Sequence, residues 1–170
     1  ILLFSHDRCT SKAIFKCSSE GSDSLKGRKI LEERVMKLVG ADGSFSQQSV
    51  NYHRVVMDTI SWVISTMKEL GENNLDSQVS ERLEALGLWL YQFVQNDSGA
   101  VPNMGANDGA MIENLHNCDY RDFRPSLQLY FSLTIGHFIF PQDDYDESAF
   151  WRLGYSYKQI ERKNLEKPNA

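Results

Sequence analysis

The chain lacks the sequence features that define disulfide-rich, zinc-binding and membrane-spanning proteins. It holds three cysteines, Cys9, Cys17 and Cys118, an odd number with no CxxC pair among them. This pattern favours neither a disulfide framework nor a zinc site, so we interpret all three as free thiols. No apolar run approaches the roughly 20 residues that a membrane helix needs, and we therefore predict no membrane insertion.

Positive charge is also scarce. The 170 residues carry a formal net charge of −5, with a sequence pI near 5.4. Nucleic-acid binding favours a basic face, so we predict no nucleic-acid partner. An acidic polymer could still bind, because a local basic cleft can form on an acidic protein. The four histidines lack a metal-ligand spacing such as HExxH, and we predict neither a metal nor a cofactor. The chain starts without Met, and we expect it to be a piece of a longer protein.

Apolar residues recur at helical spacing over most of the chain. The periodicity predicts helices over 25–39, 49–70 and 75–95, separated by GADGS and by a short turn. A fourth helix is predicted to begin near Pro125 and run to Phe140, and a short one to begin near Asp144–Glu147. No strand pattern is convincing. Short loops between successive helices are typical of antiparallel hairpins, so the predicted fold is all-α, built of helical hairpins.

The helical pattern is interrupted from Asn96 to Arg124. A loop of this length inside a domain is uncommon and is usually functional or disordered. This segment contains Met104, Ile112, Tyr120 and Phe123, which favours an ordered, polar-lined loop over disorder.

Two polar clusters could carry chemistry. One opens the helix at 49, and the other lies in the long loop; because loops at the same end of antiparallel hairpins lie together, the two are expected to meet. The candidate catalytic residues are Tyr52 and His53, and the candidate substrate-binding residues are Gln48, Asn51, Arg54, Asn103, Asn107, Asp108, Tyr120, Arg121 and Arg124.

A tyrosine beside a histidine and an arginine has a chemical rationale. A neighbouring cation stabilises the phenolate and lowers the phenol pKa, so Tyr52 could take a proton from carbon and return one to a leaving oxygen. His53 could share this proton transfer, and amide side chains could stabilise enolate-like charge.

Structural roles remain open for the same residues. Tyr52 lies on the apolar stripe of its helix and could be a core residue, while His53 and Arg54 could be solvated first-turn residues. The Asn-Asp-Gly sequence after position 106 is a strong turn signal in its own right. The carboxylates of the loop could also form a glycosidase acid/base pair, drawn from Asp108, Asp119 and Asp122.

Three motifs together resemble a known family. They are DGSFSQQSVNYHR at 42–54, PNMGANDGA at 102–110 and CDYRDFRPSLQ at 118–128. In combination they resemble the helical domain of heparinase II/III-type polysaccharide lyases, over roughly residues 25–153. Residues 1–24 match poorly, and 154–170 form a polar tail that would lead to a C-terminal β domain.

The resemblance implies a partial (α/α) toroid and β-elimination on a uronic-acid-containing polysaccharide. The family's catalytic tyrosine falls on Tyr52. The Asn-His element that binds the uronate carboxylate in the family has no match in residues 1–24, and a further catalytic histidine comes from the β domain. The chain alone is therefore expected to be inactive. The implied source is bacterial, in the periplasm or cell envelope, with an acidic polysaccharide as partner and with Arg54, Arg121 and Arg124 attracting it.

Two other functions remain open. One is a carbohydrate-binding or surface-polysaccharide biosynthesis accessory protein that keeps the toroid without turnover. The other is an α/α-barrel glycoside hydrolase that uses two carboxylates.

Overall fold

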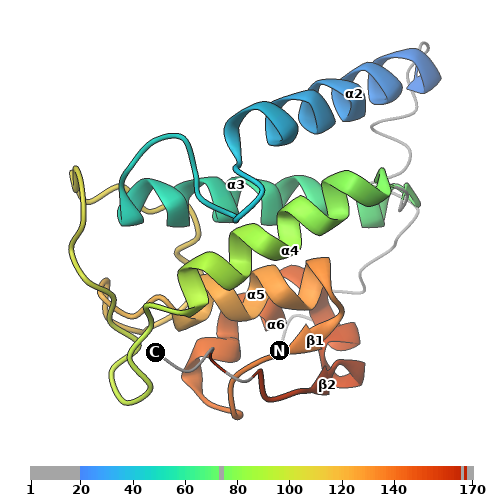
Figure 1. The fold of residues 1–170 in the computed structure, drawn as a ribbon. Helices are drawn as coiled ribbons and strands as arrows, with labels where there is room; N and C mark the ends of the chain where they lie inside the picture. Colours follow the sequence, from blue (N-terminus) through green and yellow to red (C-terminus); the bar gives the residue numbers. More distant parts are fainter. Residues whose placement is uncertain (1–19, 73–74, 166, 168–170) are drawn as a thin grey trace.

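A computed structural model describes residues 20–72, 75–165 and 167. These residues are mostly helical, which confirms the all-α prediction. The helices are α2 (Glu20–Leu38), α3 (Val50–Glu69), α4 (Ser77–Tyr91), α5 (Arg124–Thr134) and α6 (Glu147–Leu153), and their arrangement is shown in Figure 1. None of them combines the length and the apolarity that crossing a membrane requires. Cys9 and Cys17 lie outside the described residues, and Cys118 is a free thiol.

The first turns of α3 and α4 are capped by side chains. The hydroxyl of Ser49 accepts the backbone N–H of Tyr52 at 3.2 Å, and the carboxylate of Asp76 accepts that of Gln78 at 2.8 Å. Such caps satisfy N–H groups that a helix start leaves without intrahelical partners. The capping fixes where α3 begins, and therefore where the polar cluster of its first turns lies.

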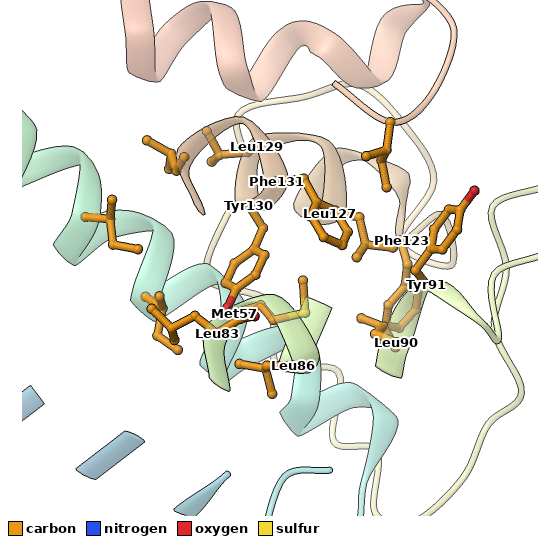
Figure 2. Packing of buried hydrophobic residues seen from close by; sticks show 14 of the residues in the cluster. Met57, Leu83, Leu86, Leu90, Tyr91, Phe123, Leu127, Leu129, Tyr130 and Phe131 are labelled. Carbon is orange, nitrogen blue, oxygen red and sulfur yellow. Dashed lines mark hydrogen bonds between the residues drawn. The ribbon is translucent and has the colours of Figure 1, made fainter. Parts of the chain in front are cut away.

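The core forms where α5 packs against α3 and α4. Leu127, Tyr130 and Phe131 of α5 are completely buried, as are Met57 of α3 and Leu86 of α4 (Figure 2). A Cβ at Gly87 would lie 2.8 Å from the Phe131 ring, so glycine is required for this close approach of α4 and α5. α2 packs against α4 rather than pairing chiefly with α3, its neighbour in sequence.

The predicted helix from Pro125 to Phe140 is wrong at its C-terminal end. α5 stops at Thr134, and Gly136 adopts a left-handed φ of +77°. The chain then turns into strand β1 (His137–Phe138), where the amide oxygen of Gln128 accepts the N–H groups of Ile139 and Phe140, both at 3.1 Å. Gln128 thus replaces the backbone partners that a continued helix would have supplied.

The segment after α6 packs back onto the domain. Beyond the 3₁₀ helix η2 (Gly154–Gln159), strand β2 (Glu161–Arg162) pairs in parallel with β1. The Tyr91 hydroxyl donates to the Leu165 carbonyl at 2.9 Å, and the Arg162 guanidinium lies over the Phe138 ring at 4.8 Å. These two strands are short additions to a helical fold.

Candidate functional site

The long loop lies against the N-terminus of α3, so the two predicted polar clusters do meet. The N–H of Val50 donates to the Met104 carbonyl at 3.0 Å, and the Ser49 hydroxyl donates to the Ala106 carbonyl. Between them Gly105 has a φ of +76°, and a Cβ there would lie 2.0 Å from the Gln48 carbonyl oxygen. Backbone contact therefore holds the loop in place, and glycine makes that contact possible.

Tyr52 projects from this junction toward the loop. Its hydroxyl donates to Oδ2 of Asp108 at 2.6 Å, and the Asn51 amide lies 3.5 Å from Oδ1. The nearby carboxylate raises the pKa of Tyr52, while the hydrogen bond from the phenol lowers the pKa of Asp108. The expected lowering of the Tyr52 pKa by a cation is therefore wrong, because the charge beside the phenol is negative.

A second tyrosine extends the network. The Tyr120 hydroxyl lies 2.8 Å from Oδ1 of Asn51 and 2.8 Å from Oδ1 of Asn107, and its single proton can be donated to one of them at a time. Asn107 in turn donates to Oδ1 of Asn103 at 3.2 Å. Asn51, Tyr52, Asn103, Asn107, Asp108 and Tyr120 thus form one connected group, which we call the Tyr52 cluster.

Arg54 holds two residues of this cluster in place by hydrogen bonds. Its guanidinium donates to the Tyr120 carbonyl at 2.7 Å and to Oδ1 of Asn51 at 3.1 Å, and it lies between the Tyr120 and Phe123 rings at 4.4 and 4.3 Å. The residue is only 1% exposed, and this burial lowers its pKa. The predicted contact between Arg54 and a polymer does not fit this position, because the side chain does not reach the surface.

His53 faces α4, away from the Tyr52 cluster. Its Nε2 lies 2.8 Å from the Leu86 carbonyl, so this nitrogen carries the proton, and the ring stacks on Trp89 at 4.6 Å. Burial lowers the His53 pKa to about 4. The predicted proton-transfer role for His53 does not fit this geometry, because adjacent helical residues point about 100° apart and the imidazole packs against α4.

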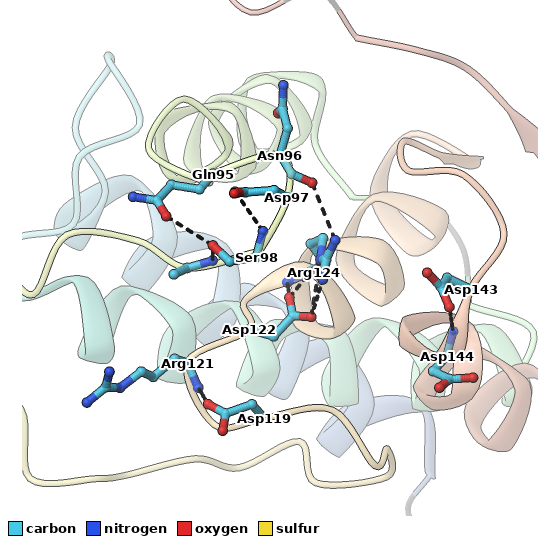
Figure 3. A network of polar contacts seen from close by, with 11 residues as sticks. Gln95, Asn96, Asp97, Ser98, Asp119, Arg121, Asp122, Arg124, Asp143 and Asp144 are labelled. Atoms are coloured by element: carbon cyan, nitrogen blue, oxygen red, sulfur yellow. Dashed lines mark hydrogen bonds and ion pairs between the residues drawn. The ribbon is translucent and has the colours of Figure 1, made fainter.

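The remaining predicted residues lie outside the cluster. Gln48 and Arg121 are exposed, and no side-chain contact joins them to Tyr52. Arg124 forms an ion pair with Asp122 at 2.7 Å and lies over the Tyr145 ring at 4.8 Å. Figure 3 shows Arg121 extending away from the Arg124–Asp122 pair. Of Arg54, Arg121 and Arg124, only Arg121 has an exposed side chain, so these three arginines do not form the predicted basic cleft.

Two buried carboxylates were assigned no role in the predicted site. Asp58 of α3 is 1% exposed and accepts the N–H of Glu113 at 3.2 Å; Glu113 itself is 0% exposed. Burial raises the Asp58 pKa to about 7, against the lowering effect of a hydrogen bond from Ser126. The available signal was the spacing of Arg54 and Asp58, an i, i+4 pair of opposite charge. Because the pair lies on the polar side of α3, away from the apolar stripe that carries Tyr52, no sequence pattern marked its burial.

Two cavities of the domain lie away from Tyr52. One of about 180 Å³ lies between α3, α4 and α5 and is lined by Lys68 and by apolar residues such as Ile64 and Leu83. Another of about 700 Å³ is lined by acidic residues, among them Asp143 and Asp144, together with Phe150 and Tyr157. Asn103, Asn107 and Asp108 are exposed, so the Tyr52 cluster opens to the surface. Within the described ranges, no three His, Cys, Asp or Glu side chains are grouped so that they could hold a metal ion.

Comparison with known proteins adds no relative. No protein-family model matches the chain, and neither the curated proteins nor the solved structures include a significant match.

Proposed function

We propose that the chain is the helical part, a partial (α/α) toroid, of a lyase that cleaves uronic-acid-containing polysaccharide by β-elimination. The observation that carries the proposal is the contact between Tyr52 and Asp108. It brings together two of the three motifs on which the family resemblance rests, at the position where the resemblance puts the catalytic tyrosine. Cleavage of an acidic polysaccharide in the periplasm or cell envelope belongs to the same proposal.

In this mechanism Tyr52 acts as the general acid. Its raised pKa keeps the phenol protonated at neutral pH, so it can protonate the C4 oxygen that leaves when the C5 proton is lost. Asp108 holds the hydroxyl until substrate displaces that hydrogen bond. The side chains of Asn103 and Asn107 are exposed. In this proposal their amides donate to a uronate carboxylate, which acidifies the C5 proton.

The base that removes the C5 proton is not assigned to a residue of this chain. His53 is buried against α4, and the family resemblance assigns a further catalytic histidine to a following β domain. Turnover is therefore a property of the full-length protein in this proposal.

The test uses the full-length protein and a panel of uronate polymers. Elimination creates an unsaturated uronate that absorbs in the ultraviolet, and hydrolysis does not. We expect Tyr52→Phe to abolish the absorbance change while retaining polymer binding. Tyr155→Phe is the matched control, because that side chain is 86% exposed. Full activity of the Tyr52 variant would refute the assigned role.

A carbohydrate-binding protein without turnover is the second candidate. It is favoured by the position of Asp108, whose carboxylate lies 2.6 Å from the phenol. This charge repels a uronate carboxylate and opposes formation of a phenolate. Polymer binding without any unsaturated or hydrolysed product, by the full-length protein, would select this candidate over the lyase and over a glycoside hydrolase.

A further inference from the structure

Glu113 fixes the middle of the long loop to the helices at a buried point. There Glu113 donates its N–H to Asp58 of α3 at 3.2 Å, and its Oε2 accepts from Trp62 of α3 and from Arg152 of α6, both at 3.0 Å. Asp58 also takes a hydrogen bond from Ser126 of α5. One loop residue and one helix residue thus connect the loop to α3, α5 and α6.

This point is buried and holds two acids. Asp58 and Glu113 are 1% and 0% exposed, and within the described part of the chain Oε1 of Glu113 has no hydrogen-bond partner. Charge is costly in such a place unless it is paired and fully hydrogen-bonded. The Arg152 guanidinium pairs with Glu113, whereas Asp58 has hydrogen bonds from neutral groups and only the more distant charge of Arg54.

We propose that Asp58 and Glu113 form a proton-sensitive anchor, which holds the loop most tightly when Asp58 is protonated and loosens it when Asp58 ionises. Ionisation places a second negative charge beside Glu113 in a site closed to water. The loop that would loosen also carries Asn107 and Asp108, so the anchor controls the geometry of the Tyr52 cluster. The inference rests on these buried contacts and is independent of the proposed function.

The direction of the pH effect follows from linkage. Burial raises the pKa of Asp58 from 3.8 to about 7, and opening the loop to water would return it toward 3.8. The opening equilibrium therefore increases as pH rises from about 4 to about 7, by up to about tenfold per pH unit, and is constant above that.

Two charged groups act on Asp58 directly, and two further groups interact with Glu113. Arg54 of its own helix lowers its pKa, and Glu113 of the loop raises it. Arg152 of α6 faces Glu113, and His116 of the loop is half-buried with a pKa below its usual value. Protonation of His116 at acid pH opposes the effect of Asp58, so the contribution of Asp58 must be isolated by comparing variants.

Hydrogen exchange of two amides in the 170-residue chain provides the test. The Glu113 N–H reports on the anchor, and the Val50 N–H, bonded to the Met104 carbonyl, reports on the other end of the loop. Exchange is measured by NMR from pH 4.5 to 8.5 and corrected for the intrinsic rate, in wild type, in Asp58→Asn and in Asp97→Asn. Asp97 is an exposed carboxylate of the same loop and provides the matched control.

We expect the ratio of wild-type to Asp58→Asn opening to rise up to about tenfold per pH unit toward pH 7 and then level off, at both amides. Asp97→Asn should behave as wild type. The same pH dependence in wild type and Asp58→Asn would overturn the anchor, and an effect confined to Glu113 would overturn its control of the Tyr52 cluster.

A direct titration keeps the test valid if Asp58→Asn fails to fold. The ¹³C resonance of the Asp58 carboxyl in the wild-type chain should move with an apparent pKa near 7, and Glu113→Gln should bring that value down. A carboxyl that titrates near 4 would overturn the proposal.

Discussion

Gly105→Ala should separate the loop from α3, and its effect can be worked out from two glycines of the same loop. Gly105 and Gly109 have φ values of +76° and +79°. An alanine at either position pays the left-handed penalty of about 1–2 kcal/mol. At Gly109 nothing lies within 4 Å of the added Cβ, whereas at Gly105 the Cβ would be 2.0 Å from the Gln48 carbonyl oxygen and 2.7 Å from the Ser49 Cα.

The clash at Gly105 involves backbone, so the loop itself must move. That movement breaks the hydrogen bond from Val50 to Met104 and the one from Ser49 to Ala106, each worth about 0.5–1.5 kcal/mol. Together with the left-handed penalty, the expected loss for Gly105→Ala is about 2–5 kcal/mol, against about 1–2 kcal/mol for Gly109→Ala.

Urea denaturation of the two variants and of wild type measures these losses. The Gly105 variant should unfold at a clearly lower urea concentration than the Gly109 variant, and its Val50 amide should exchange faster. Equal midpoints for the two variants would refute the inference that the backbone contact at Gly105 holds the loop on α3.

Three further substitutions test the buried polar groups. Wild type should lose stability between pH 4 and 7 as Asp58 ionises, and Asp58→Asn should keep that stability. The change in Asp58 pKa from 3.8 to about 7 corresponds to about 4 kcal/mol at 1.36 kcal/mol per pH unit. The same pH–stability curve for the variant and wild type would contradict this expectation. His53→Phe should change the pH dependence of stability in the opposite direction. Because the wild-type His53 pKa is lowered to about 4, wild type loses stability as pH falls from 6.5. The variant should lose less stability over that range, as measured by thermal unfolding. Arg54→Lys should lower the free energy of unfolding by about 2–4 kcal/mol in urea denaturation, because a lysine keeps the charge but loses one charged hydrogen bond and the stacking on two rings. A loss below about 1 kcal/mol would show that only the charge of Arg54 matters.

Local patterns of the sequence determined the helices and the place of the site. Apolar periodicity and the Ser49 cap marked α3 to within a residue of its observed start at Val50, because both signals act within one turn. The meeting of the α3 N-terminus with the loop at 102–110 also followed from the sequence, since antiparallel helices joined by short loops bring alternate ends together.

Side-chain direction and charge environment could not be read from the sequence. Tyr52, His53 and Arg54 are consecutive, and the sequence grouped them as one cluster around a cation. In the structure they point to three surroundings: Asp108 at the surface, the Leu86 carbonyl of α4, and a buried space between Tyr120 and Phe123. Their pKa directions follow from those surroundings, which are formed by residues more than 30 positions away.

The sequence by itself determined that the chain is helical and that its polar residues gather at the start of α3, because these properties depend on hydrogen bonds and apolar spacing within single helices. Only the tertiary structure decided that an aspartate instead of a cation faces Tyr52, and that Asp58 and Glu113 are buried together. The physical reason is that desolvation and Coulomb interactions depend on which distant segments come into contact.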